Sequence, residues 1–211
     1  MLDYFLGEPI NEGVAVTVPR QHLVPLPADR IVPMPELFLH ASTLHGQAHV
    51  TRVMVHAIRL VDATGQQEHG ARLWAAVFLH DIARRHDGVC HRHGSDAARR
   101  LREETLLQQR LTEAGLTAVD YPAIEAAITA HCAPKEATPD HEHWPLIALL
   151  KDADALDRVR LGDLDPDYLR HPEAKSMLAF AQALFDHTDG IIATGETHFQ
   201  QVWDVSRDLI G

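Results

Sequence analysis

The stretch LWAAVFLHDIARR, residues 73–85, decides the fold. Its first seven residues are all apolar, and the pair His80-Asp81 follows them directly. A helix that is apolar on all sides is typical of a buried position, so we expect an all-α protein with this helix in the middle. The helix then carries a histidine and an aspartate into the interior, where an unpaired polar group is costly.

Helical signals continue on both sides of this stretch. Upstream, Leu37, Leu44, Ala48, Val55 and Ile58 recur at near-helical spacing. Downstream, capping residues, prolines and glycines predict helices over 95–110, 122–130, 145–161, 172–187 and 196–208. Residues 131–143, which are rich in proline, charge and histidine, predict a loop.

The N-terminal segment has a different character. Residues 1–36 contain six of the 12 prolines, and the β-branched run VAVTV lies among them. We expect an extended Pro-rich arm over 1–36 and one helical domain over 37–211.

Composition excludes several classes of protein. The longest apolar stretches fall far short of the roughly 20 residues of a membrane span, and the first thirty residues lack a signal-peptide pattern, so we expect a cytoplasmic protein with no membrane partner. A net charge of −11 disfavours a protein that clamps long nucleic acid, although small phosphorylated molecules remain possible partners. Cys90 and Cys132 are too few for a disulfide framework; we interpret them as reduced thiols near a pocket, with metal ligation by Cys90 as the alternative.

Two further segments offer metal ligands of the same chemistry as His80-Asp81. His49 follows His45 by four residues, but HGQAH lacks the glutamate of the zinc-protease helix, so His45 is expected beside the site rather than in it. Asp152 and Asp154 lie about 200° apart on one helix, so only one of them can face the site. Neutral imidazole and carboxylate together favour a divalent transition metal: Mn, Fe, Co, Ni or Zn.

The order His49, His80-Asp81, Asp154 resembles the H…HD…D pattern of the HD superfamily of metal-dependent phosphohydrolases, over roughly residues 40–161. The resemblance implies an HD-type helical bundle and places Asp154, in the segment ADAL, as the last ligand. It also implies that His93 and His131 complete a second metal site, so that one or two ions bind per chain with Asp81 as the bridge. The alternative is that these two histidines contact substrate phosphate.

Basic residues beside these ligands are candidates for binding substrate phosphate. Lys151 and Arg158 lie three residues before and four residues after Asp154, and we expect both to act with Asp81 in catalysis. Arg84 and Arg85 stand where some members of the superfamily carry acids, which disfavours pyrophosphohydrolase activity of that type.

The resemblance implies hydrolysis of a phosphate ester or anhydride in a nucleotide or another small phosphorylated metabolite. Two other functions remain open. An HD-type di-iron oxygenase would use the same histidines, and a regulatory module would bind nucleotide without turnover.

Overall fold

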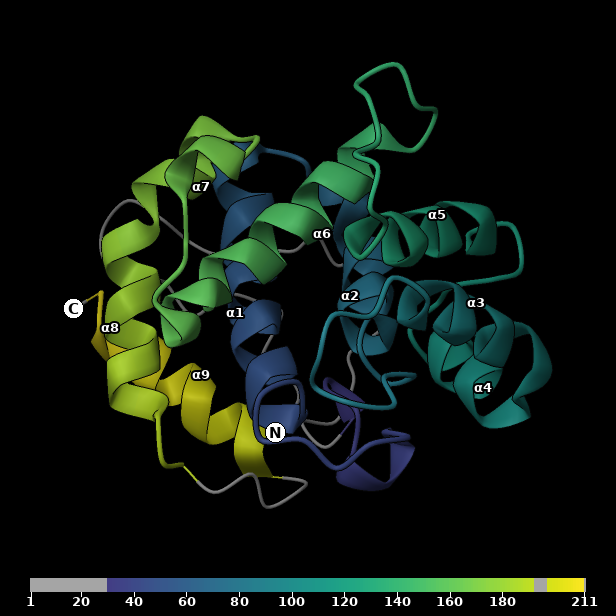
Figure 1. Cartoon of the computed structure of the whole chain (residues 1–211), viewed down its shortest axis with the longest axis horizontal. Helices are drawn as coiled ribbons and strands as arrows, with labels where there is room; N and C mark the ends of the chain where they lie inside the picture. Colours follow the sequence, from purple (N-terminus) through teal and green to yellow (C-terminus); the bar gives the residue numbers. More distant parts are fainter. Residues whose placement is uncertain (1–29, 192–196, 211) are drawn as a thin grey trace.

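The computed structural model describes residues 30–191 and 197–210, and every regular element within these ranges is helical. The expectation of an all-α protein is confirmed (Figure 1). The α-helices are α1 (Gln47–Thr64), α2 (Gly70–Leu79), α3 (His93–Glu103), α4 (Thr105–Glu113), α5 (Tyr121–His131), α6 (Trp144–Leu156), α7 (Pro172–Ser176), α8 (Leu178–Thr188) and α9 (His198–Asp208). Short 3₁₀ helices lie between some of them, η3 (Gln67–His69), η4 (Asp157–Leu161) and η5 (Pro166–Tyr168), and η2 (Pro35–Leu37) precedes α1.

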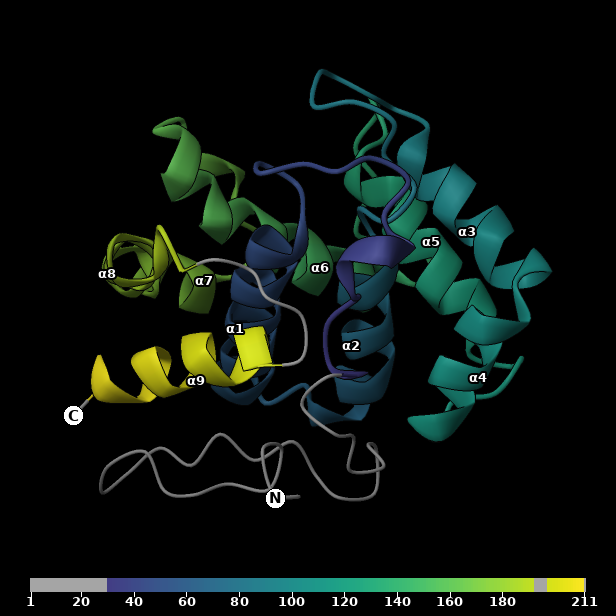
Figure 2. The same cartoon turned by 90° about the horizontal axis from the view of Figure 1, so that it is seen from below.

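Helix α2 lies in the middle of the core, as its sequence predicts. Nine of its ten residues are buried, and it packs on α1, α5 and α6. Helix α1 supplies a second buried wall, because its apolar residues recur every three to four positions from Val50 to Val61. Helices α3, α4 and α5 lie on one side of the α1–α2 pair, and α7, α8 and α9 lie on the other (Figure 2).

Helix ends explain two differences from the sequence-based boundaries. The helix expected over 95–110 begins earlier, at His93, and is interrupted at Glu104, whose extended backbone separates α3 from α4. Ser95 therefore lies inside the first turn of α3 rather than at its cap. The predicted stops are confirmed at Gly115 and Gly162, which adopt the left-handed conformation (φ 80° and 70°) that glycine tolerates best.

Most of the predicted N-terminal arm falls outside the described residues. Of its last residues, Ile31 and Val32 are buried in the core, and the Trp74 indole N–H donates to the Ile31 carbonyl at 3.0 Å. Among the described helices, none is both long enough and apolar enough to cross a lipid bilayer.

Two buried histidines predict a loss of stability in acid. His56 in α1 and His198 in α9 are 0% and 1% exposed, and their ring nitrogens have no hydrogen-bond partner among the described residues. Burial lowers the pKa of each ring from 6.5 to about 4. The unfolded chain therefore binds protons first as the pH falls, so stability present at pH 7 is lost as the pH falls below about 6.5.

We expect His56→Leu to remove part of this acid sensitivity. Each histidine should cost the metal-free protein about 2 kcal/mol of unfolding free energy between pH 7.5 and 5.0. Urea unfolding of the wild type and of the variant at both pH values measures the difference. If the wild type and the variant lost the same unfolding free energy, the pKa of His56 would not be lowered in the folded state.

Candidate metal centre

The His80-Asp81 pair lies where α2 ends. Helix α2 stops at Leu79, the His80 amide still donates to the Ala76 carbonyl at 3.0 Å, and Asp81 begins a turn that closes with a bond from the Arg84 amide at 3.1 Å. His80 keeps a helical backbone (φ −55°, ψ −39°), and its Nε2 lies 3.7 Å from Asp81 Oδ2, so the two adjacent side chains reach the same space.

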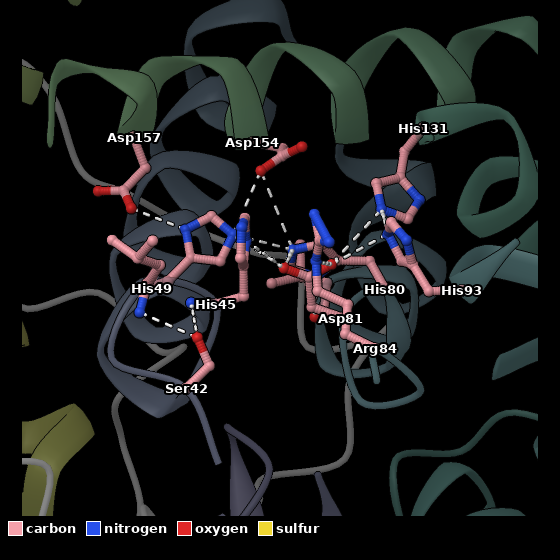
Figure 3. A network of polar contacts seen from close by, with 12 residues as sticks. Ser42, His45, His49, His80, Asp81, Arg84, His93, His131, Asp154 and Asp157 are labelled. Atoms are coloured by element: carbon pink, nitrogen blue, oxygen red, sulfur yellow. Dashed lines mark hydrogen bonds and ion pairs between the residues drawn. The ribbon is translucent and has the colours of Figure 1, made fainter. Parts of the chain in front are cut away.

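Four side chains, from α1, α6 and the turn that follows α2, form a first group of ligand atoms that includes Asp81 Oδ2. His49 comes from α1, His80 follows α2 and Asp154 lies in α6 (Figure 3). His49 Nε2 lies 3.2 Å from His80 Nε2, 3.5 Å from Asp81 Oδ2 and 3.3 Å from Asp154 Oδ1. His80 Nε2 is 3.7 Å from the Asp81 oxygen and 4.0 Å from the Asp154 oxygen. Two atoms that each lie about 2.1 Å from one ion are at most about 4.2 Å apart, and these five separations are all within that limit.

A second group forms around the other oxygen of the same carboxylate. His93 opens α3 and His131 ends α5, and their Nε2 atoms are 2.8 Å apart. These atoms lie 3.1 Å and 3.8 Å from Asp81 Oδ1. Asp81, which is 3% exposed, therefore faces two imidazole pairs, one with each oxygen. This is the arrangement that a carboxylate bridge between two ions requires.

Contacts at Nδ1 fix the orientation of the four imidazole rings, those of His49, His80, His93 and His131. In each ring Nδ1 contacts an oxygen, which places the proton on Nδ1 and leaves a lone pair on Nε2. The acceptors are Asp157 Oδ2 for His49 (2.7 Å) and the carbonyls of Val77, Cys90 and Ile128 for His80 (2.8 Å), His93 (2.9 Å) and His131 (2.5 Å).

Two facing Nε2 lone pairs at 2.8 or 3.2 Å repel each other unless a proton or a cation lies between them. Two nitrogens bound tetrahedrally to one ion are about 3.3 Å apart, close to both separations. The residues present therefore fit a divalent ion in each group.

Charge at the centre is also suited to a cation. Burial lowers the pKa of His80 to about 4, so this ring is neutral at pH 7. Burial opposes ionisation of Asp81 and Asp154, but the neighbouring histidines outweigh it and hold the pKa of both carboxyls far below the usual range. The His80 ring is thus neutral and both carboxylates are ionised. Burial opposes protonation of His93, but the Asp81 carboxylate outweighs it and raises the pKa of His93 to about 10, so this ring would release a proton on binding an ion.

No protein-family model, curated protein or solved structure matches this chain.

The buried histidine and aspartate groups can hold a metal ion on their own geometry. Three sets of side chains have ligand atoms within 4.8 Å of one another: His49 with His80 and Asp154, His45 with His49 and Asp81, and His93 with His131 and Cys132. His45, expected beside the site, contacts Asp81 Oδ2 through Nδ1 at 3.1 Å and is only partly buried.

Sequence reasoning placed Asp154 rather than Asp152 at the site, and the two carboxylates do face different surroundings. The Asp154 side chain is 30% exposed and faces the histidines. Asp152 is buried, and it accepts hydrogen bonds from the Arg170 and His171 amides at 2.8–3.0 Å and from their side chains at 2.8–3.1 Å. Asp152 therefore anchors the loop before α7 to α6.

Sequence reasoning missed Asp157, which positions His49. It is fully buried, and in addition to the His49 contact it receives the Arg52 guanidinium at 2.5 Å. Burial opposes its ionisation, but the His49 hydrogen bond and the Arg52 charge lower its pKa to about 2. A carboxylate behind a ligand histidine fixes the ring and makes it a better donor. The available signal was its place three residues after Asp154, on the same side of the chain.

We expect Asp157→Asn to weaken metal binding at the first group about 10- to 100-fold, because the amide cannot hold the His49 ring as a charged acceptor. Competition with a chromogenic chelator measures the affinity. Asp163→Asn is the matched control, since Asp163 is an exposed carboxylate paired with Arg158. If Asp157→Asn bound metal with unchanged affinity, Asp157 would pair with Arg52 without influencing the metal site.

Four of the candidate ligands, Asp81, His93, His131 and Asp154, line a cleft of about 230 Å³. Three arginines line it: Arg84, Arg158 and Arg160. Arg84 donates to Asp81 Oδ1 at 3.1 Å, while Arg158 is about half exposed and paired with Asp163. Arg160 is almost fully buried and donates to the Asp157 carbonyl at 3.0 Å.

Lys151, the other expected phosphate contact, is directed elsewhere. Its ammonium lies 2.7 Å from Glu136 and donates to the Ala130 carbonyl at 3.2 Å, and it is not among the described residues that line the cleft. Arg85 is also not among them, and sequence reasoning had not singled out Arg160.

Proposed function

We propose that this protein is a metal-dependent phosphohydrolase of the HD type that cleaves a phosphate ester or anhydride of a nucleotide or another small phosphorylated metabolite. The observation that supports this most is the Asp81 carboxylate between two pairs of imidazoles whose Nε2 atoms converge. A centre for two ions beside a cationic cleft is the arrangement used for in-line displacement at phosphorus.

The arginines favour phosphate over an uncharged substrate. Guanidinium groups bind phosphate oxygens in a forked geometry, and three of them reach a cleft that also contains two carboxylates. Arg158, at the exposed mouth, is free to change its partner from Asp163 to a substrate. Arg84 and Arg160 are held in place by Asp81 and Asp157, so they are preorganised and need little reordering.

In the proposed reaction, divalent ions, when bound, would activate water and offset charge on the phosphoryl oxygens. His49, His80, His93, His131, Asp81 and Asp154 would hold these ions. Arg84 and Arg160 hold the phosphoryl group against the metal centre, and Arg158 offsets charge on the substrate at the mouth. Water attacks phosphorus as the bond to the leaving oxygen breaks, so one oxygen of the product phosphate comes from water.

A second cavity, of about 590 Å³, offers room for the organic part of the substrate. Arg160 lines both this cavity and the smaller cleft beside the candidate ligands, and Leu44, Phe185 and Ile191 give the cavity apolar walls. Small-molecule sites are usually about 300–1,000 Å³, so the cleft alone is small for a nucleotide whereas the neighbouring cavity is large enough. We therefore expect Arg160 to lie between the phosphate and the organic group.

The test is a screen of nucleotides, sugar phosphates and other phosphometabolites, repeated with Mn²⁺, Co²⁺, Ni²⁺, Fe²⁺ and Zn²⁺. Turnover should stop on chelation and return on adding metal. In ¹⁸O-labelled water the released phosphate should carry the label. Incorporation of oxygen from dissolved O₂ into a carbon product would instead establish a di-iron oxygenase, which the same paired histidines would also suit. Nucleotide binding without any turnover would indicate that the protein is a regulatory module.

A pair of variants on α6 separates ligand loss from structural damage. Asp154→Ala should abolish turnover and lower metal occupancy, because it removes a ligand oxygen, while Asp152→Ala should keep its metal. The second variant should nevertheless lose several kcal/mol of unfolding free energy, because it breaks a buried network. If both variants folded and lost metal equally, the assignment of Asp154 rather than Asp152 as the ligand would be wrong.

A further inference from the structure

The two groups of ligand atoms differ in how many donors they contain. The first has four: His49, His80, Asp154 and one oxygen of Asp81. The second group, as defined above, has three donors: His93, His131 and the other oxygen of Asp81. A tetrahedral ion in the second group needs a fourth donor.

Cys132 is placed to be that donor. It follows His131 directly at the end of α5, it is half-buried, and it lines the same cleft. Its Sγ lies within 4.8 Å of a ring nitrogen of His93 and of His131. The thiol donates a long hydrogen bond, 3.9 Å, to the Thr129 carbonyl, and it also contacts the His93 ring itself.

Close contact between α3 and α5 keeps the sulfur at this position. A Cβ on Gly94 would lie 3.1 Å from Cys132 Sγ and 1.8 Å from the Ile128 carbonyl oxygen. The glycine thus lets the first turn of α3, which carries His93, rest directly against the end of α5, which carries His131 and Cys132.

We propose that Cys132 is a thiolate ligand of the second metal ion, giving that site a donor set of two imidazoles, one carboxylate oxygen and one sulfur. The proposal rests on the metal centre described above and makes the two sites chemically unequal. A thiolate favours Zn²⁺, Fe²⁺ or Co²⁺ over Mn²⁺ and Mg²⁺, whereas the first group contains only nitrogen and oxygen. On binding, the Cys132 S–H bond breaks, its electron pair forms the S–metal bond, and the proton leaves to solvent.

Cys90, for which metal ligation was the alternative to the expected reduced thiol, serves as the internal control. It also lines the cleft, but it is not a member of the cluster of His93, His131 and Cys132, and its carbonyl accepts the His93 Nδ1–H bond. Cys90→Ser keeps that carbonyl and removes only the thiol.

The experiment is a titration of the metal-free full-length protein with Co²⁺, followed by absorption. One of two bound equivalents should produce an intense near-ultraviolet charge-transfer band from sulfur to cobalt, accompanied by release of a thiol proton. Cys132→Ser should lose the band and bind that equivalent about 100-fold more weakly, while Cys90→Ser should retain both properties. Cys132→Asp should restore a fourth donor and shift the preference of that site from Zn²⁺ towards Mn²⁺.

Wild-type protein gives an independent readout that needs no variant to fold. Alkylation of Cys132 by iodoacetamide, followed by peptide mass, should slow far more than alkylation of Cys90 when the second equivalent of Zn²⁺ binds. Saturation at one cobalt, two cobalts without the band, or a band that persists in Cys132→Ser would each overturn the proposal. These readouts measure binding, so failure to find a phosphorylated substrate would count against the proposed function and not against the thiolate ligand.

Discussion

Replacing Asp81 with asparagine should release both metal ions and lower kcat/KM by at least about 10³-fold. Each oxygen of this carboxylate faces a different imidazole pair, at 3.1–3.8 Å. The amide replaces one oxygen with an NH₂ group that cannot bind a cation, and it removes the negative charge that both ions share. Loss of the ions removes several kcal/mol of transition-state stabilisation.

Elemental analysis of the purified variant measures the metal, and turnover of the best substrate from the screen measures the rate. Asp96→Asn is the matched control: Asp96 is also a carboxylate paired with an arginine, Arg99, at 3.0 Å, but it belongs to neither group of ligand atoms. If Asp81→Asn retained two ions, the bridge between the two groups would be wrong.

Replacing Gly94 with alanine should eliminate the second site and leave the first intact. The added methyl would lie 1.8 Å from the Ile128 carbonyl oxygen, so α3 must move away from α5. That same oxygen accepts the Nδ1–H bond of His131. One methyl group therefore separates His93 from His131 and also disturbs the His131 ring, and overpacking of this kind typically costs about 1–3 kcal/mol of stability.

We expect the variant to bind one ion instead of two, to lose the cobalt–sulfur band and to lose at least about 100-fold in kcat/KM. Gly88→Ala is the control, because its methyl would meet only the His86 ring, at 3.3 Å, and a flexible side chain can move. Two ions in a folded Gly94→Ala protein would show that the second site does not depend on the contact between α3 and α5.

The sequence by itself determined the helical class and the chemical nature of the centre. The apolar run before His80-Asp81 can be satisfied only by burial on all sides, and a histidine or carboxylate carried into such an interior needs a partner. Helical periodicity also separated Asp152 from Asp154, because an angle of about 200° between two side chains is a property of the helix and not of its neighbours.

Only the tertiary structure decided which side chains support the ligands. Asp157 and the carbonyls of Val77, Cys90 and Ile128 fix the four rings, and they come from segments whose proximity depends on how the helices pack. Packing likewise directed Lys151 to Glu136 and brought Arg84 and Arg160 into the cleft. These contacts could not be predicted from the sequence, because the partner of a charged side chain depends on which helix packs beside it. The close approach at Gly94 that places Cys132 beside His93 exists only between two packed helices.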